Sequence, residues 1–129
     1  MTGPIKDMAE KRKARRVTTP ESLAVKDPET RVTLGFLVDL STGGMMLSGE
    51  GPFHINKSMT IKIVLPYRVM GARHLELKAI CRWKTKTPSR GMFSAGYEFP
   101  QVSAEQELMI NLIQAEYIVR ALPAANAPV

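Results

Sequence analysis

A basic run near the start of the chain has the residue types needed to bind an anion. Arg12 and Arg16 lie four positions apart, and Lys11 with Arg15 repeats that spacing one residue earlier. Two guanidinium groups at this spacing can hold one ligand from two sides, and each presents paired donors to a phosphate or a guanine edge. A solvated run of charge would have the same composition, so both interpretations are open.

A second group of polar residues follows a predicted strand, in the segment from Asp39 to Gly44. Asp39 and Ser41 share one side of an extended chain, so a carboxylate and a hydroxyl project together. The carboxylate could accept hydrogen bonds from a guanine, and Gly43 and Gly44 would let a ligand approach the backbone amides. A common β-turn, in which the serine bonds its own backbone, fits the same segment.

The net charge of +6 is concentrated at the N-terminus. The first sixteen residues contain six basic and two acidic side chains, or +4, and the rest of the chain carries only +2. Clustered basic side chains create a local positive potential. We therefore predict that residues 1–16 form a flexible arm that meets an anionic partner, with phosphate as the leading chemistry.

The length and composition are those of one globular domain. The chain has 129 residues, of which 44% are hydrophobic, enough for a modest core. Its one cysteine, Cys81, excludes an internal disulfide framework and a zinc site built from cysteine pairs. His54 and His74 have no carboxylate or cysteine at ligand spacing, and no nucleophile, base and orienting group converge. We expect no enzyme activity, no metal and no cofactor.

No segment of the sequence suggests passage into or across a membrane. The apolar runs are far too short to span a bilayer, and the first residues do not lead into a secretory signal. With a single cysteine, these features predict a cytoplasmic protein.

Alternating apolar residues predict six short strands. They lie near residues 22–25, 31–40, 45–47, 59–65, 75–84 and 93–99. In the second strand, one face is expected to carry Val32, Leu34, Phe36 and Val38. In the fifth, Trp83 is expected to close a buried stripe, and Pro66 is expected to end the fourth.

The hydrophobic period changes after the last strand. Ser103 and Gln106 fit a capping box, and apolar residues from Leu108 onward recur at helical spacing, which predicts one amphipathic helix to about Arg120. Residues 121–129 are expected to be a disordered tail. The fold class is therefore all-β with one C-terminal helix, as a small antiparallel barrel or split barrel whose opening the helix covers.

Together, the two motifs resemble those of the PilZ family, bacterial receptors for cyclic di-GMP. Arg12 and Arg16 match the family's RxxxR motif, and Asp39, Ser41 and Gly44 match its DxSxxG motif. The resemblance extends to about Arg120. It implies a six-stranded antiparallel PilZ-type barrel with its C-terminal helix in residues 17–120, preceded by a flexible basic arm in residues 1–16.

The resemblance also implies roles for these residues. The two arginines would contact guanine edges and phosphates, Asp39 a guanine, and Ser41 with the Gly44 turn a phosphate or sugar. Further candidates are Lys11, Arg15 and Gly43. The chain would be a stand-alone receptor whose arm becomes ordered on cyclic di-GMP and alters a surface for an effector protein, such as motility, pilus or polysaccharide machinery.

Two other functions are open. A small basic barrel that binds single-stranded nucleic acid would need exposed aromatic side chains beside basic ones, but the aromatic residues here lie on stripes that are expected to be buried, and no DNA partner is expected. A PilZ-like interaction scaffold would have the same fold but would bind no nucleotide. The intact RxxxR and DxSxxG motifs argue against this alternative.

Overall fold

A computed structural model describes residues 17–18 and 23–126 of the chain. The elements in order are β2 (Val17–Thr18), β3 (Ala24–Lys26), β4 (Thr33–Leu40), β5 (Gly44–Gly49), β6 (Ser58–Val69), β7 (Ala72–Lys86), β8 (Phe93–Glu98) and α1 (Ala104–Asn126). The predicted arm of residues 1–16 lies outside the described residues.

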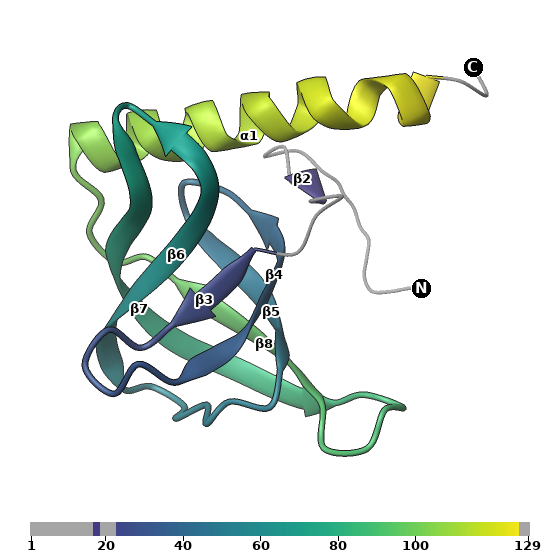
Figure 1. Ribbon diagram of the computed structural model, residues 1–129. Coiled ribbons are helices and arrows are strands. Elements are labelled where there is room, and N and C mark those ends of the chain that lie inside the picture. Colours follow the sequence, from purple (N-terminus) through teal and green to yellow (C-terminus); the bar gives the residue numbers. More distant parts are fainter. Residues whose placement is uncertain (1–16, 19–22, 127–129) are drawn as a thin grey trace.

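Six of the strands form a closed antiparallel barrel (Figure 1). The pairing runs β4–β3–β6–β7–β8–β5, and β5 pairs back to β4 to close the ring. Closure leaves no free edge in the ring, which protects a small sheet from aggregation. The short β2 pairs with the end of β4, beyond the stretch of β4 that pairs with β3. The predicted six-stranded antiparallel barrel with a C-terminal helix is confirmed.

The core fills the barrel with alternate residues of the long strands. Ile61, Ile63 and Leu65 of β6 face Leu75 and Leu77 of β7, and all five are buried. Burial of one such side chain contributes about 1.5–3 kcal/mol. The predicted alternation in these two strands is therefore confirmed over this stretch.

Strand β4 buries a different set of residues from the set that alternation predicted. Leu34, Leu37 and Leu40 are buried, whereas Phe36 is 44% exposed and Val32 is exposed before the strand begins. Two register shifts, one against β3 and one against β5, each give β4 one extra residue. Such bulges reverse the alternation of inward and outward side chains beyond them.

Strand β7 contains a bulge of the same kind at Arg82. Cys81 pairs with Tyr97 and Trp83 pairs with Gly96, so Arg82 is the extra residue. Cys81 is buried, but Trp83 is 44% exposed because the bulge turns it to the outer face of the barrel. The prediction that Trp83 closes the buried stripe is wrong.

Strand β6 continues past Pro66, where the predicted strand ends. The register between β6 and β7 is irregular between Val64 and Val69, and Pro66 has no partner in the pairing. Proline lacks a backbone N–H, so it is tolerated where the ladder is already interrupted.

Helix α1 begins at the predicted capping box. The Ser103 N–H donates to Oε1 of Gln106 at 2.8 Å, and the Gln106 N–H donates to the Ser103 hydroxyl at 3.0 Å. The helix runs to Asn126, which is six residues beyond the predicted end at Arg120. It therefore includes part of the segment that was expected to be a disordered tail.

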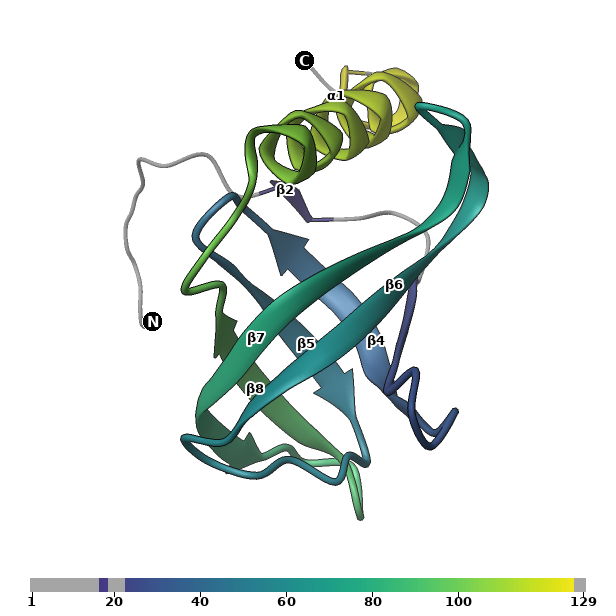
Figure 2. The ribbon, with the colours of Figure 1, turned by 90° about the vertical axis from the view of Figure 1, so that its left-hand side faces the viewer.

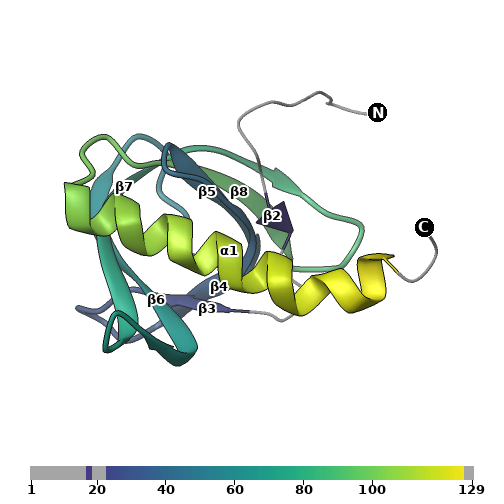
Figure 3. The ribbon, with the colours of Figure 1, turned by 90° about the horizontal axis from the view of Figure 1, so that it is seen from above.

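The helix lies across one end of the barrel (Figures 2 and 3). Among helix residues 104–116, whose burial is described, Met109, Ile110 and Ile113 are buried, whereas Leu108 and Leu112 are exposed. Side-chain amides fix this orientation, since Gln106 donates to the carbonyl of Glu76 and Gln114 to that of Leu40. The helix is apolar on more than one side, so helical spacing alone did not identify the buried face.

Candidate ligand site at the β4–β5 turn

The turn between β4 and β5 is closed by its own hydrogen bonds. The Ser41 N–H donates to the carbonyl of Gly44 at 2.8 Å, and the Gly44 N–H donates to the carbonyl of Ser41 at 3.4 Å. The Ser41 hydroxyl accepts from the Gly43 N–H at 3.2 Å and donates to the Gly44 carbonyl at 3.4 Å. The serine thus stabilises the turn, which is the alternative that the sequence left open.

The two glycines of the turn have different environments. A Cβ on Gly44 would collide with the carbonyl oxygen of Tyr97, so glycine here permits close pairing of β5 with β8. A Cβ on Gly43 would have only the Ser41 hydroxyl nearby, at 3.8 Å. The backbone at Gly43 is therefore open to an approaching ligand.

Asp39 lies on the outer face of β4, where the N-terminal segment joins the barrel. It pairs with Met46 of β5 on one side and with Thr18 of β2 on the other. Asp39 is only 8% exposed. Val17, the first residue of β2, follows Arg16 directly in the sequence, and β2 pairs with the end of β4 that contains Asp39.

A pocket of about 320 Å³ opens beside the turn, on the outer surface of β5, β7 and β8. We call it the turn pocket. It is lined by Ser41, Gly43, Gly44, Met45, Met46, Arg82, Trp83, Gly96, Tyr97 and Glu98. It combines open backbone, a cation and an aromatic ring, which are three groups that a nucleotide can use.

The indole of Trp83 forms one wall of the turn pocket. It packs so closely on Gly96 that a Cβ at position 96 would collide with the ring. Gly96 faces outward because its neighbours in β8, Ala95 and Tyr97, are buried. A glycine in β8 thus provides the space in which the indole lies against the sheet.

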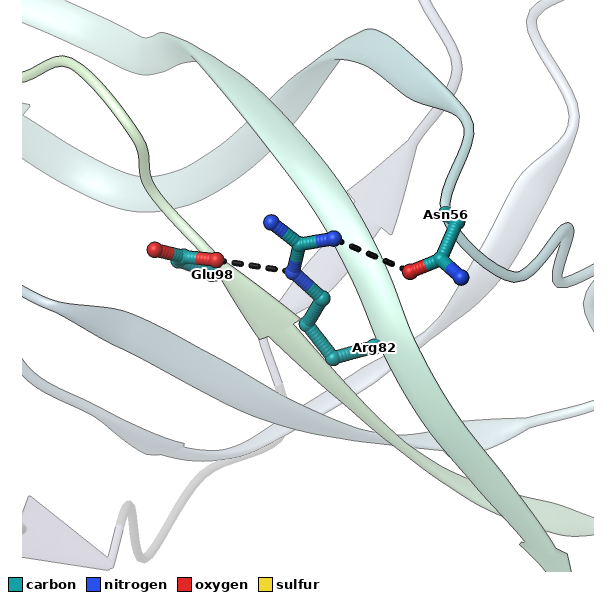
Figure 4. Close-up of polar contacts among 3 residues, drawn as sticks. All are labelled: Asn56, Arg82 and Glu98. Carbon is teal, nitrogen blue, oxygen red and sulfur yellow. Dashed lines mark hydrogen bonds and ion pairs between the residues drawn. The ribbon is translucent and has the colours of Figure 1, made fainter.

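Arg82 joins the turn pocket to a loop on another side (Figure 4). Its Nε donates to Oε1 of Glu98 at 2.8 Å, and its Nη1 donates to Oδ1 of Asn56 at 2.9 Å. The side chains of Arg82 and Glu98 are 47% and 49% exposed. An ion pair this accessible contributes little to stability, so an anion in the pocket can compete for the guanidinium.

Two neutral groups lie beneath the turn pocket. Burial raises the pKa of the Cys81 thiol and, more strongly, the pKa of the Tyr97 phenol. The Tyr97 hydroxyl is buried next to the Cys81 thiol and makes no hydrogen bond of good geometry with the residues that the structure describes. Both groups therefore remain protonated at neutral pH, and the charges at this site belong to residues on its surface.

The structure brings together part of the site that the sequence predicted. Ser41, Gly43 and Gly44 line the turn pocket, and Asp39 lies next to it on β4 without lining it. The predicted residues of the basic run, Lys11, Arg12, Arg15 and Arg16, lie outside the described residues.

Sequence reasoning missed several of the lining residues, among them Arg82, Trp83 and Glu98. The alternation pattern assigns no role to Arg82 and predicts that Trp83 is buried, because the bulge at Arg82 does not show in that pattern. Gly96 was the available signal, since a glycine on the outward side of a strand often marks close approach by a neighbouring group.

Two further observations concern the described part of the chain. No three side chains of His, Cys, Asp or Glu gather there in an arrangement that could hold a metal ion. None of its helices combines the length and apolar character that a membrane span requires.

Several solved structures share the fold. The PilZ domain of YcgR from Escherichia coli, solved with c-di-GMP, has a TM-score of 0.68 and 18% identity, over 88% of this chain and 95% of that one. The inhibitor of motility MotI/DgrA from Bacillus subtilis has a TM-score of 0.61 and 22% identity, over 84% of this chain and 51% of that one. MrkH of K. pneumonia has a TM-score of 0.67 and 13% identity, over 85% and 50%.

This chain therefore spans about half the length of MotI/DgrA and MrkH, and most of the YcgR domain. The comparison with curated protein sequences gave no match. A family model described as PilZ domain matches residues 10–115, which covers both sequence motifs and the whole barrel. The chain belongs to the PilZ domain family.

Proposed function

We propose that this chain is a receptor for cyclic di-GMP, and that it binds the dinucleotide between its N-terminal basic run and the turn pocket. One observation carries the proposal. The open backbone of the β4–β5 turn, Arg82 and Trp83 line one pocket, and Asp39 beside it pairs with β2, the strand that directly follows the RxxxR motif. The likeness to a YcgR PilZ domain solved with c-di-GMP supports the choice of ligand.

The chemistry of the ligand matches the groups at the site. The guanidinium groups of Arg12 and Arg16 would contact phosphates and guanine edges, and the carboxylate of Asp39 would accept from a guanine. The turn at Ser41 and Gly44 would contact a phosphate or sugar, with Gly43 open beside it. Lys11 and Arg15 are further candidates in the basic run.

Two residues that the sequence did not assign add to this set. The exposed indole of Trp83 offers a face on which a guanine can stack. Arg82 offers a guanidinium that a phosphate can take from Glu98. Both lie on the opposite side of the turn pocket from the β4–β5 turn.

The size of the turn pocket explains why the basic run would be needed. Its volume of about 320 Å³ is at the lower limit for small-molecule sites, and its walls leave one side open. Residues 12–16 would close that side over the ligand. Ordering them costs conformational entropy, which charge-assisted bonds to the phosphates offset.

The output would be a change of surface rather than a reaction. An arm that closes over cyclic di-GMP buries part of the barrel and presents its own outer side, which an effector protein can distinguish from the free form. The effector would belong to motility, pilus or polysaccharide machinery. The receptor would act in the cytoplasm, without a cofactor and without catalysis.

A second function has one observation in its favour. Trp83 is exposed beside Arg82, and an exposed aromatic beside a cation is what binding of single-stranded nucleic acid requires. The exposure of Trp83 is therefore compatible with that function. The third function, an interaction scaffold that binds no nucleotide, predicts that neither cyclic di-GMP nor single-stranded nucleic acid binds.

Calorimetric titration separates these three functions. The full chain is titrated at physiological salt with cyclic di-GMP, cyclic di-AMP, GTP and a short single-stranded oligonucleotide. We expect binding of cyclic di-GMP at micromolar concentration or below and no comparable heat from the others. Binding of the oligonucleotide instead would establish the nucleic-acid function, and no binding at all would leave the scaffold.

A further inference from the structure

The turn between β3 and β4 and the segment that precedes β6 lie at the end of the barrel opposite α1 (Figures 1 and 2). Between them lies a cleft of about 720 Å³, which is larger than the turn pocket. We call it the distal cleft. One wall is the turn between β3 and β4, including Asp27 and Glu29, and the other is the segment from Pro52 to Thr60, including Lys57. Its volume is within the range of specific binding sites.

The distal cleft has an apolar floor and charged walls. Leu34 is buried at its base, while Val32 is 43% exposed and Met59 is half-buried. Neither Asp27 nor Glu29 forms an ion pair with any residue in the described part of the chain. Lys57 lies on the other wall, so the acidic side of the cleft is the β3–β4 turn. An occupant that fits this cleft has an aliphatic group for the floor and a cation for the two carboxylates on that side, away from Lys57.

Both walls are built to hold their shape. The Asp27 N–H donates to the carbonyl of Val32 at 2.9 Å, and the Asp27 carboxylate accepts from the Glu29 N–H at 2.9 Å. On the other wall, the Asn56 N–H donates to the carbonyl of Cys81 at 2.7 Å. A preformed cleft loses little conformational entropy when it is occupied.

The second wall is also connected to the turn pocket. Asn56, between the lining residues His54 and Lys57, accepts from Nη1 of Arg82, whose Nε donates to Glu98 in the turn pocket (Figure 4). A phosphate in the turn pocket competes with Glu98 for the guanidinium. A rotation that turns Nη1 of Arg82 toward that phosphate would break its bond with Asn56.

We propose that the distal cleft is the docking site for a segment of a protein partner that carries an aliphatic and a basic side chain, and that Arg82 couples this cleft to the turn pocket through Asn56. The coupling rests on the proposed function, because it needs an anion in the turn pocket. The docking site does not, because it depends only on the walls and floor of the cleft.

Nuclear magnetic resonance of the full chain tests the docking site with two short peptides. Acetyl-Lys-Leu-Lys-amide is expected to shift the methyl resonances of Val32, Leu34 and Met59, and acetyl-Glu-Leu-Glu-amide to shift them several-fold less at the same concentration. Glu29→Gln should weaken binding of the basic peptide, whereas Glu50→Gln, an exposed carboxylate outside the cleft, should leave it unchanged. Equal shifts with both peptides, or none, would overturn the docking site.

Two substitutions at Asn56 test the coupling. Asn56 has a φ of 64°, which glycine and aspartate both tolerate. In the wild type, cyclic di-GMP should change the affinity for the basic peptide. Asn56→Gly should abolish that change while cyclic di-GMP still binds, and Asn56→Asp, which keeps an acceptor for Arg82, should retain it. A change that persists in Asn56→Gly would overturn the coupling.

The coupling can also be tested if cyclic di-GMP does not bind to the chain. In that case Glu98→Gln replaces the ligand, because this substitution releases Arg82 from its ion pair without any nucleotide. Glu98→Gln should then change peptide affinity with Asn56 present and have no effect in the Asn56→Gly background. An identical effect in both backgrounds would again overturn the coupling.

Discussion

The indole of Trp83 lies directly on Gly96, across the paired strands β7 and β8. This contact depends on the bulge at Arg82, which turns the tryptophan to the outer surface, and on the absence of a side chain at position 96. The same bulge leaves Arg82 between Glu98 and Asn56. One irregularity in β7 thus places both an aromatic face and a cation at the turn pocket.

The exposed indole predicts a specific loss when it is removed. Trp83→Ala should weaken binding of cyclic di-GMP by about one to two orders of magnitude, the effect of losing one stacked base. Phe36→Ala is the matched control, because Phe36 is equally exposed, at 44%, but does not line the turn pocket. Calorimetry of both variants checks this, and an equal loss in the two would remove Trp83 from the site.

The two glycines of the turn should respond differently to alanine. Gly44→Ala should lower the free energy of unfolding by about 1–3 kcal/mol, because its Cβ collides with the Tyr97 carbonyl. Gly43→Ala should change it by less than about 0.5 kcal/mol, since that position is open. Urea denaturation measures both.

Gly43→Ala then tests the ligand site without loss of the fold. If cyclic di-GMP contacts the backbone of the turn, this variant should bind it more weakly at unchanged stability. Wild-type affinity in Gly43→Ala would show that the ligand does not approach the turn there.

The charged residues of the two motifs should be needed for binding. Arg16→Ala and Asp39→Asn are each expected to lower affinity for cyclic di-GMP at least tenfold, by loss of a charge-assisted hydrogen bond of about 1.5–3 kcal/mol. Asparagine is preferred at position 39 because Asp39 is almost fully buried. Lys6→Ala is the control for net charge, and the same loss there would reduce the role of Arg16 to general electrostatics.

Alkaline pH should destabilise the fold through Tyr97 and Cys81. Burial raises the pKa values of both groups in the folded chain. In the unfolded chain, the two groups lose their protons at lower pH, near the ordinary pKa values of about 8.5 for cysteine and 10 for tyrosine. The stability is complete below those values and falls as the pH rises above them. Thermal unfolding between pH 7 and 11 measures the decline.

Tyr97→Phe isolates the tyrosine in that profile. The variant should lose much of the decline above about pH 10. At neutral pH its stability should equal or exceed that of the wild type, because it removes a buried hydroxyl that makes no hydrogen bond of good geometry with the described residues. An unchanged alkaline decline would assign the effect to other groups.

Much of the fold could be predicted because most strands keep a regular period. Ile61 to Leu65 and Leu75 to Cys81 alternate without interruption, and the Ser103–Gln106 box marks the helix start in both sequence and structure. The errors at Phe36 and Trp83 come from bulges, which depend on the partner strand and leave no mark in the strand's own alternation.

The candidate site was predictable only where it is local. Ser41, Gly43 and Gly44 lie within four residues of a single turn, so a motif is enough to find them. Arg82 and Glu98 come from strands that are distant in sequence from that turn, and only the closure of the barrel brings them to it.

The central claim is that cyclic di-GMP binds on the outer surface beside the β4–β5 turn. Amide and indole resonances of the labelled full chain, followed during titration with cyclic di-GMP, test this directly. The account predicts the largest shifts at Ser41 to Met46 and at the Trp83 indole. Shifts confined to other parts of the barrel, or no shifts at saturating ligand, would contradict it.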